Sequence, residues 1–193
     1  MDINKINESS LTRIQKHWSE HDTGTITGYR GAHDCGNGAV ITNKERGKRN
    51  NSLSGKLKGM GYGITKIKGS WFENGGKEVS EASYFVVDIN DTGNLKRDLI
   101  KLGTMFDQDA ITYADAGSDY YAISTNKCPD AWPGFGSIGK KQKLGVPKFG
   151  KTGINGFSKV NNRAFVFECD STQTSITGKL KSKLLAEMDV PLN

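Results

Sequence analysis

The sequence predicts an α+β fold, with a mainly antiparallel sheet of about five or six strands, three or four packed helices and one long Gly/Lys-rich loop. Two observations predict this class. Runs rich in β-branched and aromatic residues follow one another as neighbours, which indicates hairpins rather than strands alternating one-for-one with helices. Apolar residues elsewhere recur at spacings of three and four, which indicates amphipathic helices that pack on the sheet.

Four stretches have the periodicity of amphipathic helices. The first covers residues 8–20. The second begins at Thr42, because Thr42 and Glu45 have the spacing of a capping box. The third covers residues 93–106, and the fourth, with apolar residues at every fourth position, covers residues 176–188.

Strands are predicted over residues 25–29, 62–72, 83–88, 110–114, 120–124 and 163–168. From Trp132 to Phe157 the chain is rich in Gly and Lys and has neither the helical nor the strand period, which predicts a long irregular loop. We therefore divide the chain into an N-terminal helical segment over 1–23, a single α+β domain over 24–169, and a linker with a C-terminal helix over 170–193.

Basic residues are concentrated in part of this chain of 193 residues with a net charge of +6. Between Ala131 and Phe167 there are seven basic residues and no acidic one. Such a segment predicts contact with nucleic acid or an acidic protein surface, although a basic surface that only maintains solubility is an open alternative. The residues predicted to bind the partner are Lys140, Lys141, Lys143, Lys148, Lys151 and Arg163.

His17 and His21 have the spacing of two imidazoles on one metal, but they lie at a helix end without an intervening glutamate, a pattern that is more often two solvated side chains. The three cysteines form no Cys-x-x-Cys motif, so we predict no metal, no cofactor and reduced thiols. No apolar stretch approaches the length of a membrane span, and the first residues lack the pattern of a signal peptide. We expect a protein that does not contact a membrane.

A possible nucleotide pocket is indicated by Arg30, Ser124 and Glu168, each at the end of a predicted strand. Their order resembles the Arg, Ser and Glu order of ADP-ribosyltransferases, and this resemblance implies that arginine and serine hold NAD while glutamate orients the ribose. The sequence departs from that family at Val166, where the family has Glu or Gln two residues before the catalytic Glu.

A second resemblance is carried by the middle of the chain, between residues 43 and 109. Its motifs are Asn50-Asn51, Gly61-Tyr62, Lys66, Gly69-Ser70-Trp71, Glu73-Asn74, Glu81-x-Ser83 and Leu102-Gly103-x2-Phe106-x-Gln108-Asp109. This region resembles a small uncharacterised protein family of tailed bacteriophages, and it is similar to a bacterial domain family of unknown function with a Phe-x-Gln-x-Ala segment. The resemblance implies a viral origin and brings no activity with it.

The polar residues of these motifs flank predicted strands and a helix end, where a cleft could form or where they could act as turn formers and caps. The predicted cleft residues are Glu73, Asn74, Glu81, Gln108 and Asp109. From these observations we expect a non-catalytic bacteriophage accessory protein, located in the virion or the host cytoplasm, that is virion-associated or acts as a binding module. Its expected partner is a viral structural protein or nucleic acid. The alternative is a nucleotide-binding counter-defence protein or an ADP-ribosyltransferase-like enzyme.

Overall fold

The computed structural model describes residues 10–29, 41–73, 77–128, 136–151 and 156–167. The described helices are α1 (Ser10–Glu20), α2 (Asn43–Gly59) and α3 (Leu95–Met105). The described strands are β1 (Thr23–Ile26), β2 (Gly63–Glu73), β3 (Lys77–Val87), β4 (Ala110–Ala114), β5 (Tyr120–Ser124), β6 (Lys141–Gly145), β7 (Pro147–Phe149), β8 (Gly156–Val160) and β9 (Arg163–Phe167).

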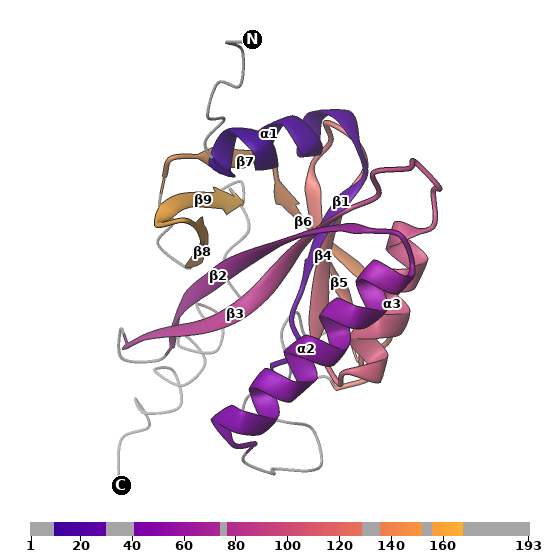
Figure 1. Cartoon of the computed structure of the whole chain (residues 1–193), viewed down its shortest axis with the longest axis vertical. Helices are drawn as coiled ribbons and strands as arrows, with labels where there is room; N and C mark the ends of the chain where they lie inside the picture. Colours follow the sequence, from indigo (N-terminus) through magenta and orange to yellow (C-terminus); the bar gives the residue numbers. More distant parts are fainter. Residues whose placement is uncertain (1–9, 30–40, 74–76, 129–135, 152–155, 168–193) are drawn as a thin grey trace, which may run out of the picture.

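These nine strands form one sheet that curls into a nearly closed barrel (Figure 1). The strand order is β6-β5-β4-β1-β3-β2-β8-β9-β7, and every pairing between described strands is antiparallel. The two ends of this order, β6 and β7, are separated in the chain by Val146 alone. Because one short stretch of chain contributes to both ends of the sheet, the sheet has to bend back on itself. Gly145 lies at this junction with a φ of 89°, a conformation that glycine adopts readily.

The predicted fold class is therefore wrong: a nine-stranded, barrel-like sheet replaces the predicted sheet of five or six strands with its long loop. The error comes mainly from residues 132–157, where β6, β7 and the start of β8 lie in the predicted loop. Strands at the ends of a sheet carry Lys and Pro, which discourage pairing with other chains, and they lack the β-branched runs that identify central strands. The sequences KQKLG and PKF have this edge composition. The predicted helix over 176–188 lies outside the described residues.

The first of two apolar clusters joins the helices to the outer face of the sheet. Leu53 and Leu57 of α2 and Leu95, Leu99 and Leu102 of α3 are fully buried there, against side chains of β1, β3, β4 and β5. In Figure 1 the two helices lie side by side across the strands. Burying five leucines in this layer contributes on the order of 2 kcal/mol each, so α2 is held firmly along its second half.

The second cluster fills the barrel and is closed by α1. It includes Phe85 of β3 and Tyr120 of β5, with Ile14 of α1 packed against them. Trp18 of α1 contacts Phe149 of β7, with ring centroids 6.2 Å apart, and Phe149 stacks on Phe165 of β9 at 6.1 Å. Helix α1 therefore covers the interior at the junction of β7 and β9.

Two further features bear on the sequence predictions. Cys128 is disulfide-bonded, so the prediction of reduced thiols is wrong for this residue. In the ranges that the structure describes, no helix is both long and apolar enough to cross a membrane.

The start of α2 confirms the predicted capping box. The Glu45 N–H donates to Thr42 Oγ1 at 3.3 Å, and the Thr42 N–H donates to Glu45 Oε2 at 2.9 Å. These bonds satisfy backbone groups that have no partner within the first turn. The capping box matters because glycines at positions 47, 55 and 59 weaken the helical preference of α2.

We predict that Thr42→Ala lowers the free energy of unfolding by about 1 kcal/mol, because the first turn of α2 loses its side-chain cap. Chemical denaturation monitored by circular dichroism measures this loss. Lys44→Ala, an exposed change in the same turn, is the control and should leave the denaturation midpoint unchanged. Equal midpoints for the Thr42→Ala variant and the native protein would contradict the assigned role.

Candidate functional site

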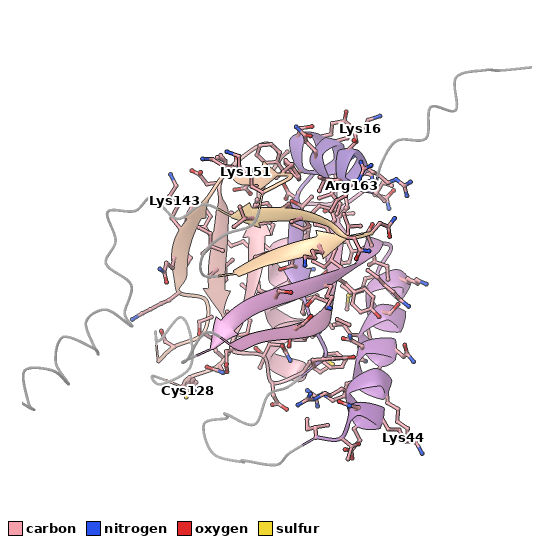
Figure 2. The ribbon with its side chains drawn as sticks, turned by 90° about the vertical axis from the view of Figure 1, so that its left-hand side faces the viewer. Lys16, Lys44, Cys128, Lys143, Lys151 and Arg163 are labelled. Carbon is pink, nitrogen blue, oxygen red and sulfur yellow. The ribbon has the colours of Figure 1, made fainter. Side chains whose placement is uncertain are left out.

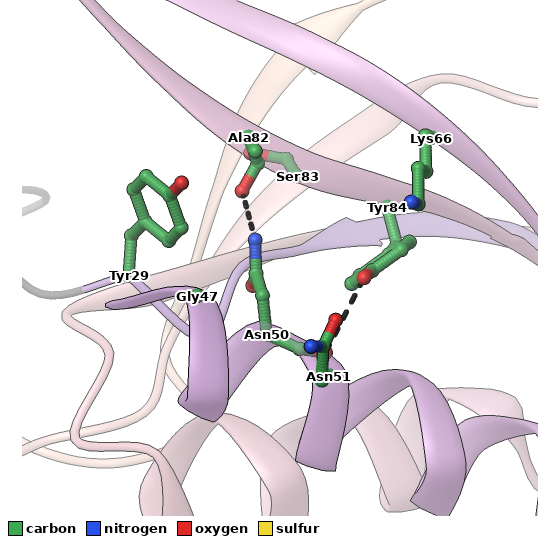
Figure 3. Close-up of a pocket in the computed structure, with 8 residues that line it drawn as sticks. All are labelled: Tyr29, Gly47, Asn50, Asn51, Lys66, Ala82, Ser83 and Tyr84. Carbon is green, nitrogen blue, oxygen red and sulfur yellow. Dashed lines mark hydrogen bonds between the residues drawn. The ribbon is translucent and has the colours of Figure 1, made fainter. Parts of the chain in front are cut away.

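A pocket of about 190 Å³ lies between the first half of α2 and the β2–β3 hairpin (Figure 3). It is lined by Tyr29, Gly47, Asn50, Asn51, Lys66, Ala82, Ser83 and Tyr84. Three segments that are distant in sequence therefore meet there: the residues after β1, helix α2 and the β2–β3 hairpin. This volume is smaller than the roughly 300–1,000 Å³ of a typical small-molecule site, so the pocket fits one end of a larger ligand.

Asn50 forms the floor of the pocket and joins α2 to two strands. Its Oδ1 accepts a hydrogen bond from the Gly28 N–H at 2.6 Å, and its Nδ2 donates to the Ala82 carbonyl oxygen at 2.8 Å. The Tyr84 hydroxyl donates to the Asn50 backbone carbonyl at 3.3 Å (Figure 3). Position 28 requires glycine, because a Cβ there would lie only 2.9 Å from atoms of Asn50. The buried Asn50 amide therefore sets the distance between helix and sheet.

Tyr29, on the wall of the pocket, is held by its backbone. Gln108 Nε2, just after α3, donates to the Tyr29 carbonyl at 2.6 Å and to the Phe106 carbonyl at 2.9 Å. Arg49 Nε donates to the Gly28 carbonyl at 2.8 Å, and its guanidinium also bonds to the Phe106 carbonyl. These side chains tie the end of β1 to the C-terminal end of α3. The pocket wall is thus fixed by structural hydrogen bonds rather than by apolar packing.

Gly47 leaves space in the pocket on the helix side. A Cβ at this position would meet no atom within 4 Å, so packing inside the chain does not require glycine. Glycine within a helix costs about 1 kcal/mol relative to alanine. Asn51 and Lys66, also on the lining, have exposed side chains that form no hydrogen bond with the described residues. Their amide and ammonium groups are therefore available to a ligand.

Glu81 lies on β3, two residues before the lining residue Ser83, and is partly buried. Because side chains alternate along a strand, it lies on the same face as Ser83 and Phe85, opposite to the face of Ala82 and Tyr84. Burial raises the pKa of Glu81 to about 7, and the positive charge of Arg46 opposes part of that increase. Its carboxyl group makes no hydrogen bond or ion pair with any described residue. A carboxyl group with a pKa near neutrality is typical of sites that bind cations or transfer protons.

Arg46 lies on α2 one turn before Asn50. Its Nε atom is buried and has no hydrogen-bond partner. Although Arg46 is close enough to influence the pKa of Glu81, the two residues form no ion pair. Leaving a buried donor without a partner costs roughly 1–3 kcal/mol, so the arrangement is stable only because the rest of α2 is well packed.

The structure distributes the predicted cleft residues over two regions. Gln108 donates to the backbone of the lining residue Tyr29, and Glu81 lies on β3 two residues before the lining residue Ser83. Asp109 instead accepts a hydrogen bond from the Asn126 side chain at 2.5 Å. Glu73 is the last residue of β2, and Asn74 lies outside the described residues.

For the predicted nucleotide pocket, the structure places Ser124 alone. Ser124 ends β5, is 2% exposed and donates from Oγ to the Asn126 carbonyl at 3.0 Å. Arg30 and Glu168 lie outside the described residues. The convergence of these three side chains stays a prediction.

The predicted partner-binding residues lie along the strands near the closure of the barrel. Lys141 and Lys143 lie on β6, Lys148 lies on β7, and Arg163 begins β9. Figure 2 places Lys143, Lys151 and Arg163 toward the α1 end of the molecule, far from Lys44 at the start of α2. Lys143 forms an ion pair with Asp119 at 2.7 Å, which gives it a structural role. Lys140 immediately precedes β6, and its carbonyl accepts a hydrogen bond from the Ser124 N–H at 3.0 Å.

Sequence reasoning missed the pocket as a unit. Asn50, Asn51, Lys66 and Ser83 belong to the motifs between residues 43 and 109, which assign them no role, and Gly47 is not part of those motifs. One signal could have identified the site: two consecutive asparagines near the middle of a helix are unfavourable for helix formation, which indicates that tertiary contacts or a ligand need them.

Comparison with known protein families identifies the chain. The model of the S-Adenosylmethionine lyase family matches residues 38–180, about three quarters of the sequence. The chain belongs to the S-adenosylmethionine lyase family. No curated protein matches it. The matched range runs from the residues before α2 to beyond β9, so every pocket-lining residue except Tyr29 is part of the region that this lyase family shares.

Membership of this lyase family overturns three sequence predictions. The predicted membership of an uncharacterised bacteriophage family is wrong, because the matching family is named for an enzyme activity. The prediction of a non-catalytic accessory protein is wrong for the same reason, and the alternative that expected an enzyme fits the family better. The assignment as a viral, virion-associated protein has no support from the family match. The predicted partners and location stay predictions.

The residue ranges that the structure describes contain no group of three or more His, Cys, Asp or Glu side chains that could hold a metal ion.

We predict that Asn50→Ala lowers the free energy of unfolding by about 1–3 kcal/mol, because the buried Gly28 N–H loses its partner. Asn51→Ala, which removes the neighbouring exposed amide, should change stability by less than about 0.5 kcal/mol. Denaturant unfolding of both variants tests the assignment. Equal losses in the two variants would show that Asn50 does not join the helix to the sheet.

Proposed function

We propose that the protein is an enzyme that cleaves S-adenosylmethionine, with its substrate held in the pocket between α2 and the β2–β3 hairpin. The observation that carries this proposal is the overlap of the family match with that pocket. A lyase breaks a bond of its substrate without adding water. In a sulfonium compound the carbon–sulfur bonds are the ones primed to break, because the sulfur leaves as a neutral thioether.

The pocket suits the adenine end of such a substrate. An asparagine amide can pair with the edge of adenine through two hydrogen bonds, and an aromatic ring can stack on its face. Asn51 and Tyr29 supply these two groups on the lining. The open space next to Gly47 lets the base approach the helix backbone. The remainder of the substrate then extends out of the pocket, which agrees with the pocket's small volume.

Glu81 supplies the negative charge that a substrate with a sulfonium and an ammonium group needs. Burial raises its pKa to about 7, so its charge depends on pH near neutrality. A bound cation favours the ionised form, so substrate binding and ionisation of Glu81 strengthen each other.

The activity is tested by incubating the purified protein with S-adenosylmethionine and following both the substrate and the thioether product by liquid chromatography and mass spectrometry. Time-dependent loss of the substrate with formation of a thioether supports the proposal. A protein that leaves the substrate intact, and that is not stabilised by it in thermal melts, would refute it.

We predict that Gly47→Gln abolishes or greatly weakens substrate binding, because the new side chain fills the pocket. The same change should raise the melting temperature, because glutamine favours the helix more than glycine does. Gly55→Gln is a matched control, since Gly55 lies on α2 outside the pocket and a Cβ there also meets no atom within 4 Å. It should raise the melting temperature without changing substrate binding. Unchanged binding in the Gly47→Gln variant would place the substrate elsewhere.

We predict that kcat/KM for S-adenosylmethionine rises with pH through about 7, because Glu81 gains its charge as the pH passes its pKa. Below this pH the carboxyl group is neutral and attracts the cationic substrate less. Glu81→Gln should lower kcat/KM and remove this step from the pH profile. A step that persists in the Glu81→Gln variant would belong to another group.

A further inference from the structure

A basic face lies at the end of the barrel that α1 closes. Residues 10–20, 147–151 and 156–167 form α1, β7, β8, β9 and the residues directly beside them, and they include one acidic side chain, Glu20. The same ranges include six basic side chains: Arg13, Lys16, Lys148, Lys151, Lys159 and Arg163. Such an excess of one sign gives the face a positive potential, which attracts an anionic partner.

Three of these cations come from different elements and meet at this end of the molecule. Lys151 follows Gly150, whose N–H donates to the Ala164 carbonyl at 2.8 Å, and Arg163 directly precedes Ala164. Lys151 and Arg163 therefore lie at the same end of the β7–β9 pair. Helix α1, which carries Lys16, contacts β9 and covers this end (Figure 2).

The charges of these three residues are not neutralised within the described part of the chain. Lys16, Lys151 and Arg163 are exposed, and their side chains form no ion pair or hydrogen bond with any described residue. Lys143 on β6 differs, because its ammonium is paired with Asp119. Like charges that are held near one another repel, so gathering them does not stabilise the folded chain. An anionic ligand would remove that repulsion.

Two aromatic rings lie among the cations. Trp18 of α1 and Phe149 of β7 are only partly buried against the interior cluster, and their ring centroids are 6.2 Å apart. Arg163 lies two residues before Phe165, the ring on which Phe149 stacks, so it projects from the same face of β9 as that ring. Cations beside partly exposed aromatic rings are typical of proteins that bind single-stranded nucleic acid, because the cations neutralise phosphates while the rings stack on bases. An acidic protein surface would leave the rings without such a partner.

We propose that this face binds single-stranded nucleic acid, with Lys16, Lys151 and Arg163 contacting the phosphates. The exposed parts of Trp18 and Phe149 stack on the bases. A single strand suits the face better than a duplex, because the bases of a duplex are already stacked on one another. The inference is independent of the proposed function, since none of these residues lines the pocket.

The test measures fluorescence anisotropy of a labelled oligothymidylate of about 20 nucleotides with the full chain, over a series of salt concentrations. The native protein should bind it, with an affinity that falls as salt rises. The double variant Lys151→Glu, Arg163→Glu should bind about tenfold or more weakly at low salt. Its slope of log affinity against log salt concentration should be smaller in magnitude by about 1.4, because two phosphate contacts are lost.

A matched control separates this face from the net charge of the protein. The double variant Lys44→Glu, Lys48→Glu makes the same change of charge at two exposed positions on α2, and Figure 2 shows Lys44 far from the face. It should keep the native affinity and the native slope. Thermal melts establish that each variant folds, and Lys16→Glu on the exposed side of α1 probes the same face if the first double variant does not fold.

The role of the aromatic rings is tested with a second ligand. Phe149→Leu keeps an apolar side chain at this position but removes the ring. It should weaken binding of the oligothymidylate several-fold and leave the binding of heparin, a polyanion without bases, unchanged.

Four results would overturn the inference. The first is a native protein that does not bind the oligothymidylate, and the second is an equal loss of affinity in the α2 control, which would reduce the effect to net charge. Binding of heparin or polyglutamate as tightly as the oligothymidylate would assign the face to acidic polymers or an acidic protein instead. Tighter binding of a DNA duplex than of the single strand would exclude stacking on the rings.

Discussion

The site depends on one buried amide, the side chain of Asn50, which joins α2 to β3 and to Gly28, two residues after the end of β1. Its oxygen accepts from the Gly28 N–H and its nitrogen donates to the Ala82 carbonyl. Gly28 and Ala82 lie at the point where β1 has ended and the β2–β3 hairpin extends beyond it. Without that amide, the polar half of α2 would have no specific contact with the sheet, and the pocket would lose its floor.

Helix α2 is divided into a half for packing and a half for binding. Leu53 and Leu57 are fully buried and anchor the second half on the sheet. The first half carries Arg46, Gly47 and Asn51, which leave a free donor, open space and an exposed amide. None of these three features stabilises the folded chain, and each suits a ligand. This is the trade-off expected of a binding site, where groups arranged for a ligand remain unsatisfied until it arrives.

The barrel provides the rigid support for this helix. The segment of β6 and β7 contributes to both ends of the sheet, and α1 covers the interior through Ile14 and Trp18. A curled sheet with a filled interior holds the β2–β3 hairpin at a fixed place relative to α2. The match to the S-adenosylmethionine lyase family covers both α2 and this hairpin.

The sequence alone determined the features that depend on neighbours along the chain. The capping box at Thr42, the hairpin of β4 and β5 and the leucine stripe of α3 are local patterns, and each lies where the sequence placed it. Among the predicted cleft residues, Gln108 donates to the backbone of the lining residue Tyr29, and Glu81 lies two residues before the lining residue Ser83. The closure of the barrel depended on the tertiary structure, because the Lys- and Pro-containing strands β6 and β7 have no local signal. The pocket also depended on the tertiary structure. Tyr29, Asn51 and Lys66 are far apart in sequence, and only the pairing of β1 with β3 and the packing of α2 bring them together. Hydrophobic periodicity records which face of an element is buried, but it carries no information on which elements meet.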